Sequence, residues 1–133
     1  MRKTIVAALF PLALFGCSNA GGSSGTEISM AEGQVFAPDE LTVSAGDSVT
    51  WTNDSSEAHT VTAYDDKIPT GSTYFSSGGA SSEDVARDEL EDGLVAEGET
   101  YEFTFEEPGS YSYFCIPHEA QGMVGTIVVE ESE

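Results

Sequence analysis

The chain has 133 residues, which predicts a single domain, and its 24 acidic against 4 basic residues give a formal net charge of −20. Nucleic-acid binding needs a basic surface, so this charge excludes nucleic acid as a partner. Self-repulsion on this scale destabilises a compact chain at low ionic strength, so the composition indicates a halophilic protein that works in concentrated salt. The 39% share of hydrophobic residues favours a folded domain over an acidic, partly disordered chain.

Residues 1–17 have the form of a secretory signal, with a basic start, an apolar run over 4–15 and Gly16 directly before Cys17. The apolar run is too short for a comfortable membrane span. A small residue before cysteine resembles the lipobox of prokaryotic lipoproteins, whose cysteine receives a diacylglycerol after cleavage. We therefore expect Cys17 to be a lipid attachment site. An uncleaved helical anchor is the alternative, and both place the domain outside the cytoplasm at the cell membrane.

Residues 18–26 are rich in Ser and Gly and predict a flexible tether that reaches on the order of 30 Å when extended. The folded domain is expected over 27–133. Its strand signals are short runs of β-branched and aromatic residues separated by Gly, Pro and Asp turns. These runs lie at 41–43, 48–53, 59–64, 100–105, 110–114 and 125–130. They predict an all-β protein, an antiparallel β-sandwich.

The break between the predicted strands, residues 65–99, is longer than a tight connection and is called the insertion below. Ser81 is a candidate N-cap, and acidic residues crowd the turn that follows. This pattern predicts one short helix, which ends near Leu90.

The segment with the clearest chemistry contains Cys115, His118 and Met123 in the spacing Cys-x2-His-x4-Met between two predicted strands. Thiolate, imidazole and thioether together suit copper. A second imidazole must come from His59, the only other histidine of the chain. Cys115, His59 and His118 would form a trigonal plane, with Met123 as the long axial ligand. The sequence therefore predicts one type 1 copper ion per chain.

Other metal sites fit the sequence less well. Structural zinc usually shows paired Cys-x2–4-Cys or His-x3–5-His spacings, which the chain lacks. A dinuclear copper centre would need a second cysteine near Cys115, and a multi-copper enzyme would need further histidines. Taken singly, Cys115, Met123 or either histidine has an ordinary structural explanation, so the prediction depends on their combination.

Residues 28–130 resemble the plastocyanin branch of the cupredoxins. The likeness is strongest in the Tyr-x-Tyr-Phe-Cys-x-Pro-His-x4-Met-x-Gly pattern that ends at Gly125, and it extends to Phe36-Ala37-Pro38 and Val49-Thr50-Trp51. With the acidic composition and the lipobox, the chain looks most like the halocyanins. The resemblance implies a Greek-key sandwich that shuttles single electrons and is not an enzyme. Thr60 stands where family members often have an Asn that braces the cysteine loop.

We expect a hydrophobic shell around the copper. Its predicted members are Phe36, Phe114, Ile116 and Val124, and Thr60 and Pro117 are also expected beside the ligands. Such a shell would exclude water and help to set the reduction potential.

His118 is the expected electron exit, because the ligand on the loop usually reaches the surface in this family. Ile116, Pro117, Ala120 and Val124 would surround it as an apolar docking rim. The expected partners are redox proteins of a membrane respiratory chain, met by a lipid-anchored monomer. A copper storage or delivery module and a cupredoxin without a working redox site are the alternatives.

Overall fold

The computed structural model describes residues 26–132. The predicted signal, Cys17 and nearly all of the tether lie outside the described residues. Within residues 26–132, no helix has both the length and the apolar character that crossing a membrane requires.

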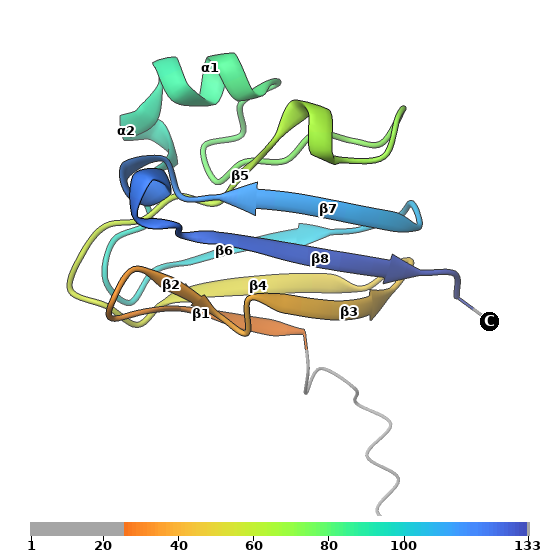
Figure 1. Ribbon diagram of the computed structural model, residues 1–133, viewed down its shortest axis with the longest axis horizontal. Helices are drawn as coiled ribbons and strands as arrows, with labels where there is room; N and C mark the ends of the chain where they lie inside the picture. The colour runs from red at the N-terminus through yellow and green to blue at the C-terminus, as the bar shows by residue number, and fades with distance from the viewer. Residues whose placement is uncertain (1–25, 133) are drawn as a thin grey trace, which may run out of the picture.

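Two four-stranded sheets pack face to face (Figure 1). The first sheet has the order β2-β1-β4-β6, formed by Val35–Ala37, Glu27–Ala31, Ser48–Asn53 and Thr100–Thr104. The second sheet has the order β3-β8-β7-β5, formed by Glu40–Ser44, Val124–Glu130, Gly109–Phe114 and Thr62–Ala63. The predicted β-sandwich is confirmed.

The sheets are mixed, whereas the sequence predicted an antiparallel sandwich. Strand β1 runs parallel to β4, and β3 runs parallel to β8 with Leu41 opposite Ile127. The reason is that the chain leaves the first sheet after β2 and returns to it as β4 in the direction of β1. Strands β1 and β2 were not predicted individually, because each buries only one or two side chains.

The core follows from the alternation of side chains along each strand. In β4, Val49, Trp51 and Asn53 point inward, and in β7, Tyr111 and Tyr113 do so. The Trp51 and Tyr113 rings meet edge to face with centroids 5.4 Å apart. This aromatic layer lies between the sheets and continues directly into Cys115, which is fully buried.

The insertion lies along the free edge of β5, at the top of Figure 1. Ala63 N–H donates to Phe75 O at 3.1 Å, and Ser77 N–H donates to Val61 O at 2.8 Å. These bonds extend the second sheet beyond β5. Phe75 is only 2% exposed and stacks on Phe103, with 4.9 Å between ring centroids. The insertion therefore supplies part of the core instead of looping away from it.

The insertion holds two short helices, α1 (Glu83–Asp88) and α2 (Leu90–Gly93), where the sequence predicted one. The backbone of Glu89 departs from helical geometry and separates them. The N-cap of α1 is Ser82 and not Ser81, because the Ser82 hydroxyl accepts from Val85 N–H at 3.3 Å. The 3-10 turns η1 (Asp65–Lys67) and η2 (Ile116–Gln121) complete the elements.

Candidate metal centre

The loop of residues 115–123, called the ligand loop, runs from the end of β7 through η2 to β8. Its two ends are tied together, because Cys115 N–H donates to Met123 O at 3.0 Å. Inside it, His118 N–H donates to Cys115 O and Met123 N–H donates to His118 O, each at 3.2 Å. Gly122 closes the turn in the left-handed region, with φ 83°. Backbone bonds thus fix three predicted ligands relative to one another.

His59 reaches the ligand loop from the segment that precedes β5. Its Nδ1 lies 3.1 Å from His118 Nδ1 and 3.6 Å from Cys115 Sγ, and His118 Nδ1 lies 3.4 Å from the same sulfur. Donors of a single ion with bonds of about 2.0–2.3 Å are separated by such distances. Met123, in the same loop, is fully buried. These four side chains fit one type 1 copper ion, as the sequence predicted.

The two histidines turn the same atom, Nδ1, toward the cysteine and use the other nitrogen for a hydrogen bond. His59 Nε2 lies 2.7 Å from the Ser55 hydroxyl, and His118 Nε2 lies 2.8 Å from Glu57 Oε2. A partner on Nε2 fixes the tautomer and leaves the Nδ1 lone pair for a metal. Sequence reasoning missed Ser55 and Glu57, because neither belongs to a spacing pattern with its histidine.

A buried network holds Ser55 in place. The Ser55 hydroxyl donates to Asn53 Oδ1 at 2.8 Å, and Asn53 Nδ2 donates to the backbone oxygens of Glu57 and Val95 at 2.7 and 2.9 Å. Asn53 and Ser55 are both at most 2% exposed. The His59 ring is therefore fixed by the end of β4 as well as by its own backbone.

Burial sets the protonation of the free donors. Desolvation, followed by the neighbouring His118 ring, lowers the pKa of His59, which favours the neutral imidazole that a metal needs. Desolvation raises the pKa of the Cys115 thiol, and a bound cation would favour the thiolate that ligation needs. Thr60 N–H donates to Cys115 Sγ at 3.4 Å and would stabilise that charge.

Thr60 braces the ligand loop through its hydroxyl. Ile116 N–H donates to Thr60 Oγ1 at 2.9 Å, and Thr62 Oγ1 lies 3.0 Å from the same oxygen. The Thr60 hydroxyl therefore accepts the bond from the loop and stands in for the bracing Asn that family members often have. The loop and the His59 segment are joined at this point.

The structure corrects part of the predicted hydrophobic shell. Phe36 is buried against Tyr113, with 4.7 Å between ring centroids. Phe114 is fully buried, but it lies on the face of β7 opposite Tyr113 and Cys115, because neighbouring residues of a strand alternate. It stacks there on Tyr64, with 4.3 Å between ring centroids. Val124 is 45% exposed, which fits a surface position and not an enclosing shell.

Two other residues predicted around the ligands, and the ligand His118 itself, lie at or near the surface. Pro117 is exposed, Ile116 is half-buried, and the His118 side chain keeps 13% of its surface exposed. This arrangement fits a rim around the loop histidine better than an enclosing shell.

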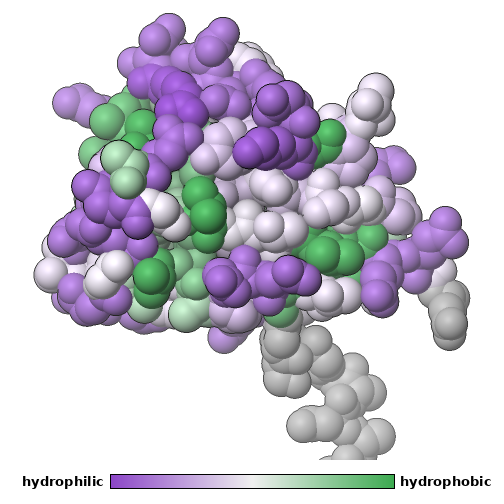
Figure 2. All heavy atoms as spheres, in the orientation of Figure 1, coloured by the Kyte–Doolittle hydropathy of each residue, from purple (hydrophilic) through white to green (hydrophobic). Residues whose placement is uncertain are grey.

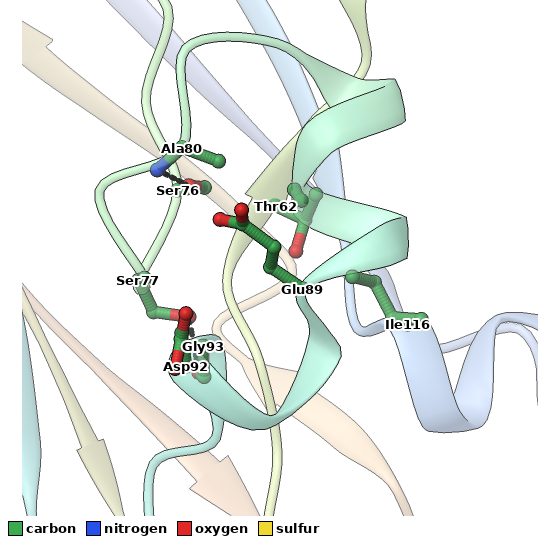
Figure 3. A pocket seen from close by; sticks show the side chains of 10 residues that line it. Thr62, Ser76, Ser77, Ala80, Glu89, Asp92, Gly93 and Ile116 are labelled. Carbon is green, nitrogen blue, oxygen red and sulfur yellow. Dashed lines mark hydrogen bonds between the residues drawn. The ribbon is translucent and has the colours of Figure 1, made fainter.

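The insertion packs closely against the ligand loop. Figure 3 shows Thr62, Ile116 and residues of the insertion such as Glu89 around a cavity of about 10 Å³, which holds roughly one water. On the other side, Val95 of the insertion pairs with the His59 backbone through bonds of 2.7 and 3.2 Å. Both ligand-bearing segments therefore touch the insertion.

Comparison with known proteins agrees with this geometry. Residues 24–130 match the model of the copper binding proteins of the plastocyanin/azurin family. The chain is 38% identical to plastocyanin of Scenedesmus fuscus over 72% of this chain and 87% of that protein. It is 32% identical to chloroplastic plastocyanin of Tetradesmus obliquus over 98% and 83% of the two chains.

A solved structure of a mutant fern plastocyanin shares the fold, with a TM-score of 0.57 and 25% identity over 78% of this chain and 99% of that one. The family match spans both sheets and the whole ligand loop. The chain belongs to the plastocyanin/azurin family of copper-binding proteins.

Proposed function

We propose that this protein is a one-electron carrier that works at the outer face of a membrane and is not itself an enzyme. The observation that carries the proposal is the set of three nitrogen and sulfur donors held 3.1–3.6 Å apart by backbone bonds. Bound copper would supply a one-electron couple. The protein holds the donors in place, so little structural change accompanies a change of oxidation state.

The proposed location and partners follow from the leader and the charge. The lipobox-like sequence before Cys17 supports a lipid anchor on the extracytoplasmic side, and the net charge of −20 supports a halocyanin-like protein in concentrated salt. A tethered monomer of this kind would meet redox proteins of a membrane respiratory chain. A copper store or delivery module would instead release its ion readily.

We propose that partners dock on the apolar rim around His118. Ile116 is half-buried there, while Pro117, Ala120 and Val124 are exposed. Figure 2 shows a largely hydrophilic surface with separate apolar patches, several of them toward the end that holds η2 in Figure 1. In roughly molar salt the Debye length is about 3 Å, so charge steering is weak and apolar contact decides docking.

Replacing Val124 by Glu should slow electron transfer to a membrane redox partner by about tenfold in molar salt, the effect of losing about 1.4 kcal/mol of docking energy. Stopped-flow bleaching of the blue band measures the rate. Val128→Glu is the matched control, because it adds the same charge to the same strand four residues away. Equal rates for the two variants would exclude docking through the rim.

Replacing Glu57 by Gln should raise the reduction potential of the bound copper. The Glu57 carboxylate touches His118 and stabilises the more positive Cu(II) state, so its loss favours Cu(I). A tenfold change in this one-electron equilibrium corresponds to about 59 mV. A redox titration of the blue band should give one reversible one-electron step for both proteins.

Glu32→Gln is the control for this measurement. Glu32 accepts a bond from Ser56 N–H at 2.7 Å at the same end of the molecule. Equal shifts in both variants would show that only the general field matters and not the contact with His118. Rapid loss of copper to a chelator during the titration would favour delivery over electron transfer.

A further inference from the structure

Arg87 of helix α1 binds the ligand loop through a bidentate contact with Glu119. Its Nη1 donates to Glu119 Oε1 at 3.0 Å, and its Nη2 donates to Glu119 Oε2 at 3.1 Å. Two parallel bonds between a guanidinium and a carboxylate fix direction as well as distance. Glu119 directly follows the ligand His118 within η2.

The same guanidinium is itself held on its other sides. Its Nε and Nη2 donate to Glu83 Oε2 at 3.0 and 2.8 Å, and its central carbon lies 4.4 Å from the centroid of the Phe114 ring. Tyr64 stacks on the Phe114 ring and donates its hydroxyl to Glu119 Oε2 at 2.8 Å. These five residues, called the Arg87 cluster, join α1, β7 and η2.

An isolated ion pair at the surface contributes little, especially in salt. The Arg87 cluster differs, because the Arg87 and Glu119 side chains keep only 35% and 34% of their surface exposed and share stacking and hydroxyl contacts. Arg87 lowers the pKa of Glu119, and hydrogen bonds to Glu119 and Glu83 raise the pKa of Arg87, so the pair stays charged. Beyond the predicted leader, Arg87 and Lys67 are the only bases against 24 acids.

We propose that Arg87 is a positioning residue: it anchors η2 to the insertion and thereby holds His118 in register with Cys115. The consequence for the metal site rests on the proposed copper function, whereas the contact between Arg87 and Glu119 is present in the protein without metal. Thr60 fixes the start of the ligand loop at Ile116, and Arg87 fixes its middle at Glu119. The insertion thus acts as a clamp on the segment that carries His118.

Replacing Arg87 by Gln should loosen the ligand loop while both sheets persist. Amide hydrogen exchange in the copper-free protein should become about tenfold faster at His118, Gly122 and Met123, whose N–H bonds lie in that loop. In the copper-loaded protein, the electron paramagnetic resonance signal should broaden or shift, and electron self-exchange should slow. Arg87→Lys keeps the charge but lacks the planar guanidinium that makes two parallel bonds, so its loop exchange rates should lie between those of wild type and R87Q.

Lys67→Gln is the matched control, because it removes the same charge; the Lys67 amine lies over the Tyr64 ring at 4.6 Å. Glu119→Gln breaks the Arg87 contact from the loop side and should reproduce the R87Q effect even if R87Q folds poorly. The proposal would be overturned if the loop amides of E119Q exchanged at the wild-type rate. It would also be overturned if R87Q and K67Q accelerated this exchange equally. A wild-type protein that binds copper without a blue band would overturn the proposed function instead, since the exchange experiment needs no copper.

Discussion

Replacing Cys115 by Ser should abolish the intense blue absorption of the copper-loaded protein. That band requires a thiolate bound to Cu(II), and Cys115 is the one cysteine among residues 26–132. The serine hydroxyl does not ionise readily at neutral pH and is a harder ligand, so copper binding should also weaken. Visible absorption of the copper-saturated protein measures the effect directly.

Cys17→Ser is the natural control, because Cys17 lies in the predicted leader, and this variant should keep the blue band unchanged. Circular dichroism of C115S should show that the sheets still form, since serine has nearly the volume of cysteine. A blue band that survives in C115S, or a colourless wild type saturated with copper, would contradict the assigned site.

Replacing Phe75 by Ala should lower the free energy of unfolding by about 3–5 kcal/mol, the usual cost of deleting a buried aromatic ring. Phe75 packs against the rings of Trp51, Phe103 and Phe105 and is 2% exposed. The loss is a large part of the 5–15 kcal/mol that typical domains possess. Denaturant unfolding of the copper-free protein in high salt measures it.

Val35→Ala provides the comparison, because Val35 is 47% exposed and its truncation should change stability by less than about 0.5 kcal/mol. Equal stability of F75A and V35A would mean that the insertion adds nothing to the core. A shortened variant that lacks residues 65–99 should fail to fold, because it loses the Phe75 ring from the core together with the rest of the insertion.

The ligands could be predicted from sequence because three of them share one short loop and His59 is the only histidine left to complete the set. Their hydrogen-bond partners could not, because Ser55 and Glu57 meet the histidines through the fold of a loop without periodic pattern. Phe114 was predicted in the hydrophobic shell and is buried, but alternation along β7 puts its side chain on the face opposite Cys115.

The insertion shows a different limit of sequence reasoning. Phe75 belongs to the core, yet the stretch around it is rich in Ser, Thr and Gly and lacks the alternating pattern of a strand. It pairs with β5 through only a few backbone bonds. Such pairing is decided by the shape of the open sheet edge, and the neighbouring residues carry no signal for it.

The parallel pairing of β3 with β8 joins two parts of the chain that are far apart in sequence. Strand β8 follows the ligand loop and lies between β7 and β3. In sequence, β3 is much farther from β8 than β7 is. Contacts between such distant segments form slowly, and they form only once the last strand is present. The donors of the copper site therefore come together only when β8 is in place, and we expect the metal to bind after the sandwich has closed.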